Sequence, residues 1–194
     1  SMLSYKESLK ILKETNALLE GHFILSSGLH SDKYIQCAKL MSKPDKAQLL
    51  CQSLADKIKS KFNKIDLILS PAMGGIIIGY EIGRLLKKET IFAERVNGKF
   101  NLRRGFEIKD GQKVLMVEDV ITTGKSSLEC LNLITNAKAE IIGYACLIDR
   151  SNGKSLIDKK IVSQIEIQIP TYDKNSLPDH LKNSQPTKPG SRNS

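Results

Sequence analysis

The sequence predicts an α/β fold in which a mainly parallel sheet is flanked by helices, with a small N-terminal lobe and a flexible lid added to it. Short β-branched apolar runs alternate with segments of helical periodicity, which is typical of parallel sheets with right-handed crossovers. One of these runs ends in two adjacent carboxylates and passes directly into a loop rich in hydroxyl groups. The 194 residues are expected to form a single domain, with residues 1–40 contributing the lobe and residues 94–110 the mobile lid.

The individual elements follow from hydrophobic periodicity. Short apolar runs predict strands at residues 65–69, 90–93, 114–117, 141–148 and 161–167, and two more strands around a turn at 26–28, the second over 32–36. Apolar residues at helical spacing predict helices at residues 5–20, 44–60, 76–87 and from 128 onward. Gly75, Gly79 and Gly83 recur at helical spacing on one face, where they can permit close packing. Gly74 and Gly75, at the exit of the preceding strand, are expected instead to let backbone amides approach a diphosphate. The tail contains three prolines and is expected either to wrap the surface or to fray.

Composition narrows the class of partner. The net charge is +9, from 30 Lys and Arg against 21 Asp and Glu, but the cations are spread along the chain and aromatic residues make up only 5%. These features do not predict a nucleic-acid partner, and the positive field suits a polyanionic metabolite. No apolar run reaches the roughly 20 residues that a membrane-spanning helix needs, so no membrane partner is expected.

The cysteines indicate a reducing compartment. Cys37, Cys51, Cys130 and Cys146 form no CxxC pair and lie in apolar or helical contexts. They are therefore expected to be reduced core thiols in a cytoplasmic protein. The three histidines are scattered and add no zinc-ligand cluster.

The most informative segment is the strand at 114–117 with the loop that follows it. Glu118 and Asp119 close the strand, and a strand, loop and helix in this order place backbone N–H groups and a positive dipole end at residues 122–126, where a phosphate can bind. The sequence from Gly124 matches the end of a nucleotide triphosphate P-loop, but Asp119 stands where that motif requires its first glycine. A carboxylate pair before a phosphate cradle suits a ribose 5-phosphate instead. An ordinary helix cap explains threonine or serine here, but not the two carboxylates.

Residues 94–105 differ in character from the segments on either side. They hold four cations and two glycines, and Asn97-Gly98 is a strong two-residue turn signal. One interpretation is a flexible β-hairpin, and the other is a mobile lid that carries positive charge to a departing diphosphate. The two interpretations are compatible, because a hairpin can serve as a lid.

Several motifs resemble those of known enzymes. Residues 117–126 closely resemble the 5-phosphoribosyl 1-diphosphate signature of the type I phosphoribosyltransferases. A wider resemblance, to the orotate phosphoribosyltransferase family, is carried by residues 21–34, 71–75, 97–99, 102–106 and 188–192. It implies the type I phosphoribosyltransferase fold and a pentosyl transfer of pyrimidine (UMP) biosynthesis. In that reaction ribose 5-phosphate passes from 5-phosphoribosyl 1-diphosphate to orotate, giving orotidine 5′-phosphate and diphosphate.

The same resemblance implies roles for individual residues. The expected catalytic residues are Lys99, which lies in the catalytic lid, Glu118 and Asp119. The expected ligands of 5-phosphoribosyl 1-diphosphate are Met73, Gly74, Arg95, Lys99, Glu118, Asp119, Val120, Ile121, Thr122, Thr123, Gly124, Lys125 and Ser126. The expected ligands of orotate are Tyr34, Ile35, Thr122 and Arg150, so that the N-terminal lobe binds the base. Many relatives have a lysine where Ser26 stands, and any role of that lysine on the diphosphate is absent here or supplied elsewhere.

The chemistry implied by this resemblance requires neutralising cations rather than a strong nucleophile. Displacement at the anomeric carbon passes through an oxocarbenium-like state while diphosphate leaves with growing negative charge. Mg²⁺ is the expected cofactor, held mostly through substrate oxygens and waters, so no metal ligands are expected from protein side chains. Arg150 is suited to grip the orotate carboxylate, and a surface ion pair with Asp149 is the alternative. The resemblance also implies a homodimer in which the lid is shared across the interface.

Two other functions share parts of this pattern. A purine phosphoribosyltransferase would have the same ribose phosphate loop but gives no reason for the N-terminal lobe. A regulator that only senses 5-phosphoribosyl 1-diphosphate would be expected to carry a DNA-binding helix-turn-helix, whereas the residues before Gly21 have room for one helix. Diphosphate release that depends on the base distinguishes the three functions.

Overall fold

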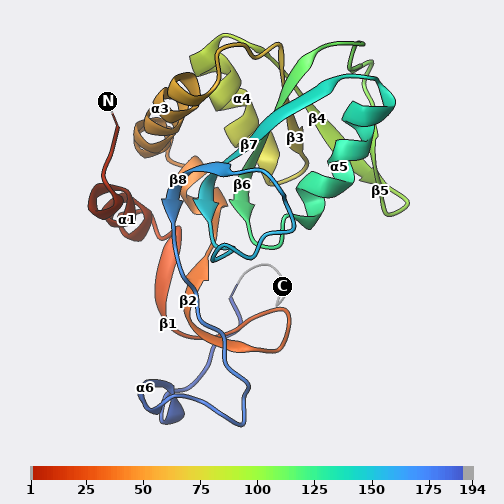
Figure 1. The fold of residues 1–194 in the computed structure, drawn as a ribbon. Coiled ribbons are helices and arrows are strands. Elements are labelled where there is room, and N and C mark those ends of the chain that lie inside the picture. The colour runs from red at the N-terminus through yellow and green to blue at the C-terminus, as the bar shows by residue number, and fades with distance from the viewer. Residues whose placement is uncertain (1, 190–194) are drawn as a thin grey trace.

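Six strands form the main sheet of the computed structural model, which describes residues 2–189 (Figure 1). Their order across the sheet is β5-β4-β3-β6-β7-β8, and all neighbours are parallel except β4 and β5. Two further strands, β1 and β2, form a separate antiparallel hairpin. The predicted α/β class with a mainly parallel sheet is therefore confirmed. The strands are β1 (Leu18–Ile24), β2 (His30–Ile35), β3 (Leu67–Pro71), β4 (Glu89–Val96), β5 (Lys99–Leu102), β6 (Lys113–Ile121), β7 (Glu140–Asp149) and β8 (Ile161–Glu166).

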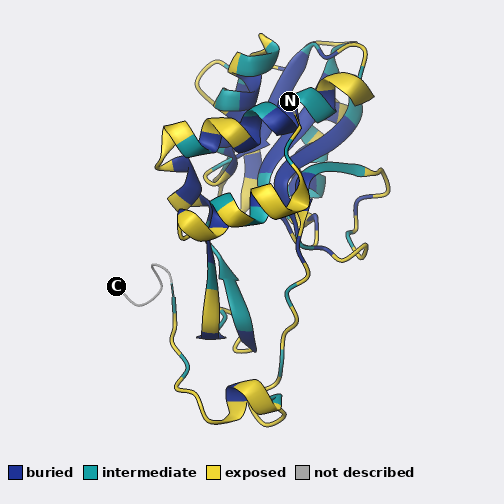
Figure 2. Cartoon of the chain, turned by 90° about the vertical axis from the view of Figure 1, so that its left-hand side faces the viewer, coloured by how far each residue is buried: buried dark blue, intermediate teal, exposed yellow. Residues whose placement is uncertain are grey.

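Helices cover both faces of the main sheet. The helices are α1 (Tyr5–Glu14), α2 (Cys37–Met41), α3 (Pro44–Lys61), α4 (Gly75–Leu86), α5 (Lys125–Asn136) and α6 (Asp179–Lys182). The first four share a core with Leu115 and Val117 of β6, whereas α5 shares a second core with Val114 and Met116 of the same strand. β6 is thus buried on both sides, which explains its continuous apolar sequence. Figure 2 shows buried strands enclosed by helices whose outer faces are exposed.

The glycines of α4 allow the close packing that the sequence predicts. A side-chain carbon on Gly79 would meet Ser70 of β3, and one on Gly83 would meet Thr90 of β4. Only glycine at these positions lets α4 lie directly on the sheet. This packing fixes the N-terminus of α4 beside the end of β3.

Periodicity overestimates the first helix and misses two short ones. α1 ends at Glu14 rather than at Glu20, because Asn16 has a positive φ of 61° and turns the chain out of the helix. Leu18 then begins β1 and is buried there. An apolar residue at this position would also be buried on a helix, so the sequence pattern alone does not distinguish the two. α2 and α6 contain five and four residues, which is too short for helical periodicity to be recognised. The other predicted helices and strands are confirmed within a few residues of their expected ends.

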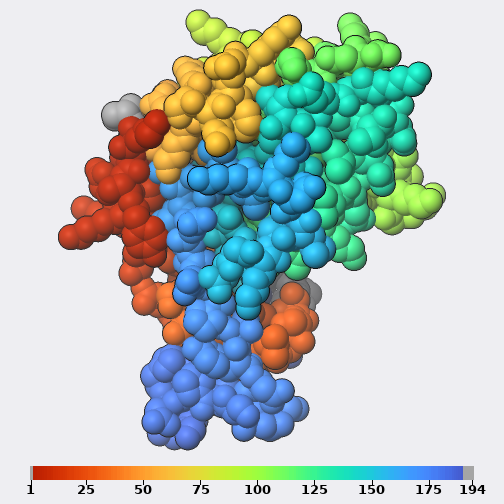
Figure 3. All heavy atoms as spheres, in the orientation of Figure 1, coloured from red at the N-terminus to blue at the C-terminus, as the bar shows by residue number. Residues whose placement is uncertain are grey.

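The N-terminal hairpin is completed by the end of the chain. The backbone of His30 exchanges two hydrogen bonds of 2.8 Å with that of Tyr172, and Thr187 N donates to the carbonyl of His22 at 3.0 Å. Two side-chain contacts add to these, because the ring nitrogens of His22 lie 2.8 Å from Ser184 Oγ and 2.7 Å from His30 Nδ1. Figure 3 shows the β1-β2 region (orange) and the last described segment (blue) forming one mass below the main body. We call this mass, the β1-β2 hairpin with residues 170–189, the lower lobe.

The tail therefore wraps the surface, at least over residues 170–189. The resemblance noted for the ending extends over residues 190–192, which lie outside the described residues. Leu12 of α1 belongs to the main core, so α1 joins the body rather than the lower lobe. Within the described part of the chain, no helix is long and apolar enough to cross a membrane.

Candidate active site

The carboxyl ends of β3 and β6 meet where the strand order reverses. The chain leaves β3 toward β4 on one side and leaves β6 toward β7 on the other. Such a topological switch point is where open α/β sheets bind ligands. The loop that follows β3 lies close to the end of β6, because a side-chain carbon on Gly74 would lie 2.7 Å from Asp119 Oδ2. The fold thus brings together the two loops that the sequence assigns to 5-phosphoribosyl 1-diphosphate.

The loop after β6 has the strand, loop and helix arrangement that the sequence predicts. Gly124 ends this loop with a positive φ of 84°, directly before α5. A side-chain carbon there would lie 2.8 Å from Ser155 Oγ and 2.9 Å from Ile157 Cγ1, so only glycine fits. The carbonyl of Thr123 accepts a hydrogen bond of 2.8 Å from Leu156 N. The segment after β7 therefore holds this loop in place, with the N–H groups of the first turn of α5 directed toward an anion.

Glu118 and Asp119 lie near the carboxyl end of β6 as an acidic pair, in which Glu118 is buried and Asp119 is half-buried. Glu118 is 8% exposed, and burial raises its pKa to about 7. Its Oε2 accepts a hydrogen bond of 2.6 Å from Ser127 Oγ. Burial also raises the pKa of Asp119, whose Oδ1 accepts a hydrogen bond of 2.7 Å from Val120 N. Because neighbouring residues of a strand face opposite sides, Glu118 points toward α5 and Asp119 toward the start of α4.

Arg150 lies beside the end of β6 with an unpaired buried donor. Its backbone N–H donates to the carbonyl of Ile121 at 2.9 Å, which fixes the residue next to the loop that contains Thr122. Its Nε is buried and has no hydrogen-bond partner within residues 2–189. Burial lowers the pKa of the guanidinium. The alternative of a surface ion pair with Asp149 is not present among the described residues, since Asp149 instead accepts a hydrogen bond of 2.8 Å from Ser151 N.

Residues 94–105 form the expected hairpin, which is tied to α5. β4 and β5 are joined by Asn97 and Gly98, with positive φ values of 53° and 81°. Arg95 makes two hydrogen bonds of 2.8 and 2.9 Å to Glu129 of α5, and its guanidinium lies 4.3 Å from the centre of the Phe100 ring. Arg95 is expected to bind the diphosphate, but in this structure its guanidinium is paired with Glu129. A contact with diphosphate would require the ion pair with Glu129 to open.

Lys99 differs from the other cations of the hairpin. Arg103 and Arg104 both pair with Glu94, at 3.8 and 2.9 Å. Lys99 lies at the start of β5 and is exposed, and its side chain makes no ion pair within the described part of the chain. Of the four cations that the sequence places here, Lys99 is the one whose charge is free for a ligand.

The two residues expected to line the base site face opposite ways. Tyr34 and Ile35 are neighbours on β2, so their side chains point to opposite sides of the hairpin. Ile35 packs against the main core, whereas the Tyr34 ring lies 6.0 Å from the ring of Phe23. The side chain of Tyr34 therefore lies on the face of the hairpin away from the main core, and that of Ile35 is occupied in the core.

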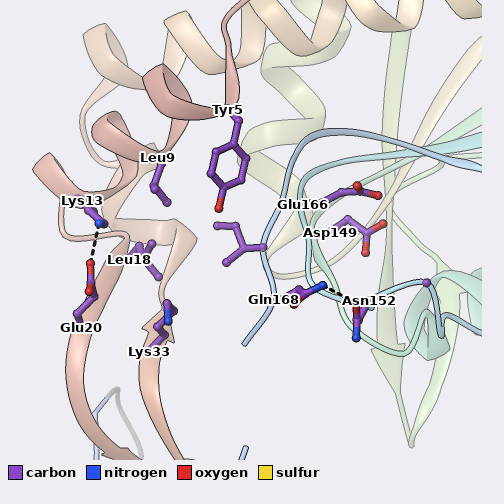
Figure 4. A pocket seen from close by; sticks show the side chains of 12 residues that line it. Tyr5, Leu9, Lys13, Leu18, Glu20, Lys33, Asp149, Asn152, Glu166 and Gln168 are labelled. Atoms are coloured by element: carbon purple, nitrogen blue, oxygen red, sulfur yellow. Dashed lines mark hydrogen bonds and ion pairs between the residues drawn. The ribbon is translucent and has the colours of Figure 1, made fainter. Parts of the chain in front are cut away.

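One cavity of the described structure lies on the opposite side of the β1-β2 hairpin from Tyr34. It has a volume of about 580 Å³ and lies between α1, the β1-β2 hairpin and the ends of β7 and β8 (Figure 4). Glu20 and Lys33 line it and are partners across the hairpin, which places them on one face. Tyr34 and its partner Leu19 are on the other face. Tyr34 therefore does not face this cavity, whereas Arg150 lies in the chain between Asp149 and Asn152, which line it.

The acidic residues of the site do not form a metal cage. Within residues 2–189, no group of three or more His, Cys, Asp or Glu side chains is arranged to hold a metal ion. One oxygen of Glu118 accepts a hydrogen bond from the Ser127 hydroxyl, and one oxygen of Asp119 accepts a hydrogen bond from a backbone N–H. This donor set suits an ion that is carried by the oxygens of the substrate and by water.

Sequence reasoning misses Ser127 and Glu129. Both lie in the first half of α5, and each pairs with a residue of the expected site, Glu118 and Arg95. In a strand, loop and helix unit the first turns of the helix fold back along the end of the strand. Polar residues in the first two turns of such a helix can therefore be recognised in the sequence as candidates for supporting the site.

The fold and the paired loops define a class of enzyme. Residues 43–182 match the family model for the phosphoribosyl transferase domain, which is more than half of the chain. The chain is also 45% identical over 188 residues to the orotate phosphoribosyltransferase of Erythrobacter litoralis, covering 96% of this chain and 97% of that protein. It is 48% identical over 187 residues to the orotate phosphoribosyltransferase of Parvibaculum lavamentivorans, with coverages of 94% and 96%. The chain is thus a phosphoribosyltransferase, and it belongs to the orotate phosphoribosyltransferase family.

Solved structures show the same fold at lower identity. The orotate phosphoribosyltransferase from Aeropyrum pernix superposes with a TM-score of 0.71 at 23% identity, covering 81% of this chain and 92% of that chain. The adenine phosphoribosyltransferase from Thermoanaerobacter pseudethanolicus gives a TM-score of 0.60 at 18% identity, with coverages of 70% and 88%. The shared fold therefore extends to enzymes named for different bases.

Proposed function

We propose that the chain transfers ribose 5-phosphate from 5-phosphoribosyl 1-diphosphate to orotate, giving orotidine 5′-phosphate and diphosphate, through the residues at the ends of β3 and β6. The observation that carries this assignment is the close approach of Gly74 to the Asp119 carboxylate, which leaves no room for a side-chain carbon, beside the loop that ends at Gly124. Three parts of the site lie together here and match the three parts of the substrate. The phosphate loop suits the 5′-phosphate, the carboxylate pair suits the ribose, and the second glycine loop suits the diphosphate. The family membership of the chain supports the same reaction.

Each part of the site has a role in this reaction. The backbone N–H groups of residues 122–126 bind the 5′-phosphate, and Glu118 and Asp119 accept hydrogen bonds from the ribose hydroxyls. Met73 and Gly74 approach the diphosphate with their backbone, since the Met73 side chain is 85% exposed. Lys99 supplies positive charge to the diphosphate as it leaves. Mg²⁺ bound through substrate oxygens would neutralise the same charge, and the protein donor set described above fits that arrangement.

The base is recognised between the body and the lower lobe. The buried, unpaired Nε of Arg150 is a donor that a carboxylate can satisfy, and orotate carries a carboxylate. Thr122 is adjacent through the hydrogen bond between Arg150 N and Ile121 O. Tyr34 offers a ring on the face of the hairpin opposite the large cavity.

We infer a homodimer from the exposed face of α4. Ile77 and Tyr80 are 58% and 68% exposed, and Met73, just before the helix, is 85% exposed. These residues follow helical spacing, so they form one apolar stripe next to the diphosphate loop. We propose that a second copy covers this stripe, which lies next to the diphosphate loop, and that the lid is shared across the interface.

We also propose a cytoplasmic location. The four cysteines are free and buried in the structure. Burial raises the pKa of Cys51 and Cys130 to about 12, so these thiols are neutral and unreactive at physiological pH. Unpaired core thiols of this kind suit a reducing compartment.

Purified protein is expected to consume orotate when 5-phosphoribosyl 1-diphosphate and Mg²⁺ are both present. The measurement is the loss of orotate absorbance, with diphosphate release followed in parallel for orotate, adenine, hypoxanthine and no base. Turnover with adenine but not with orotate would contradict the substrate assignment. Undiminished turnover in excess chelator would contradict the requirement for Mg²⁺.

Arg150→Ala is expected to weaken the use of orotate by about 10- to 150-fold, the range that corresponds to a charge-assisted hydrogen bond of about 1.5–3 kcal/mol. Binding of 5-phosphoribosyl 1-diphosphate is expected to change little, because the lost contact is local. The measurement is the KM for orotate together with the Kd for 5-phosphoribosyl 1-diphosphate. Equal weakening of both substrates would mean that Arg150 is structural. Lys182→Ala serves as a control that removes an exposed cation of the lower lobe.

A further inference from the structure

The hydrogen bond between Ser127 and Glu118 is a buried contact between two elements. Ser127 belongs to the first turn of α5 and is fully buried, and Glu118 belongs to β6 and is 8% exposed. The Oγ to Oε2 distance is 2.6 Å, in the range of charge-assisted O–H···O bonds. This is the only hydrogen bond that the Glu118 side chain makes within residues 2–189.

We propose that Ser127 is a positioning residue for the transfer reaction: its hydroxyl holds one oxygen of Glu118 and leaves the other oxygen to accept a hydrogen bond from the ribose. The proposal rests on the function assigned above, and it adds a residue outside the phosphate loop. The geometry carries it, because a hydroxyl that occupies Oε2 fixes both the rotamer of Glu118 and the direction of Oε1. Ser127 itself touches no substrate in this arrangement.

The surroundings of Glu118 favour its neutral form, which gives Ser127 a second effect. The pKa of Glu118 is raised to about 7: burial is the largest cause, the hydrogen bond from Ser127 opposes it, and the negative charge of Asp119 adds a smaller rise. The other titratable groups near Glu118 are Cys130 of α5 and Cys146 of β7, whose pKa values burial raises to about 12 and well above the usual value. These thiols are neutral at working pH, so Ser127 is the group that favours the carboxylate.

The two effects predict a change in the pH profile rather than a uniform loss. Since the pKa of Glu118 in the folded protein is raised above its ordinary value, the carboxylate is present above about pH 7 and is lost as the pH falls through that value. Removing the Ser127 hydroxyl removes a hydrogen bond to the charged form. The midpoint of the acidic limb of kcat/KM is then expected to rise by about one pH unit or more.

The experiment compares kcat/KM for 5-phosphoribosyl 1-diphosphate from pH 5.5 to pH 9, roughly spanning the expected limb, in wild type, Ser127→Ala and Ser127→Thr. Ser127→Ala is expected to lose about 10-fold at the acidic end and little at the alkaline end, which is the result of a one-unit shift. Ser127→Thr keeps the hydroxyl and is expected to keep the wild-type midpoint. The phosphate groups of the substrate titrate identically with every variant, so the difference between variants reports the protein. Ser53→Ala removes another fully buried serine, far along the chain, and is expected to leave the limb unchanged.

A second readout does not require turnover. The carboxyl carbon of Glu118 is followed by NMR in protein labelled with ¹³C-glutamate, with Glu118→Gln identifying the signal. The apparent pKa is expected to move upward in Ser127→Ala by the same amount as the kinetic midpoint. A shift in this titration without orotate turnover would retain the positioning pair and reject the proposed substrate. An unchanged titration, a loss of the same size at every pH, or a Ser127→Thr profile that matches Ser127→Ala would overturn the proposal.

Discussion

Lys99→Ala is expected to lower kcat by about 100- to 1,000-fold, the effect of removing one donor from a site that stabilises developing charge. The affinity for 5-phosphoribosyl 1-diphosphate is expected to change much less. Lys99 is the cation of the β4-β5 hairpin that forms no ion pair within the described residues, so its charge is available when the diphosphate leaves. An interaction realised mainly in the transition state lowers kcat more than it lowers ground-state binding. Steady-state kinetics combined with a direct Kd measurement tests this, and a loss confined to Kd would place Lys99 in ground-state binding alone.

A mixing experiment locates the lid relative to the site that it serves. Asp119→Asn alters the ribose position itself, so both affinity and turnover are expected to suffer. If the lid crosses a dimer interface, mixing inactive Lys99→Ala chains with inactive Asp119→Asn chains restores activity, because one site of a mixed dimer receives an intact lysine and an intact aspartate. Mixed dimers with verified subunit exchange but no recovered activity would mean that each Lys99 serves its own chain. Arg103→Ala, which removes a paired cation of the same hairpin, is the matched control for charge.

Gly74→Ala is expected to reduce kcat/KM by about 100-fold without unfolding the protein, because a misplacement of the order of 1 Å in a reacting site has about this cost. The backbone of Gly74 has φ −60° and ψ −29°, which alanine adopts without strain. The new carbon would, however, lie 2.7 Å from Asp119 Oδ2, so the carboxylate must move. Activity and thermal unfolding are measured on the same preparation, and an unchanged Tm with lost activity is the expected pair of results.

Whether Gly74→Ala acts through Asp119 is tested by making the same substitution in an Asp119→Ala variant. In Asp119→Ala no carboxylate remains to be displaced, so adding Gly74→Ala is expected to have little further effect on the Kd for 5-phosphoribosyl 1-diphosphate. This non-additivity is the mark of two residues that act through one contact. Independent losses in the double variant would show that the Gly74 backbone acts on the diphosphate rather than through Asp119.

The sequence predicts elements well where one local pattern determines them. β6 is buried on both faces, and its continuous apolar run could be recognised without knowing its neighbours. The loop that ends at Gly124 can be recognised equally well, because the carboxylates, the hydroxyl residues and the glycine lie close together in the sequence. These features place the phosphate loop and the acidic pair of the site.

The sequence does not predict contacts that depend on how distant segments meet. Leu18 fits the apolar face of a helix as well as it fits a strand, and the positive φ of Asn16 decides between them. The sequence predicts that Arg95 is a free cation, because its partner Glu129 is 34 residues away and is brought beside it only by the fold. The opposed directions of Tyr34 and Ile35 likewise follow from the pairing of β2 and not from composition.

The lower lobe joins segments that are made at very different times during protein synthesis. His22 on β1 contacts Ser184, which is 162 residues further along the chain. At a translation rate of about 5–20 residues per second, the β1-β2 hairpin exists for roughly ten seconds or longer before the segment that covers it is made. A hairpin of two strands alone is only marginally stable in water. The nascent chain is therefore expected to complete its α/β body before the segment around Ser184 covers the hairpin and completes the lower lobe.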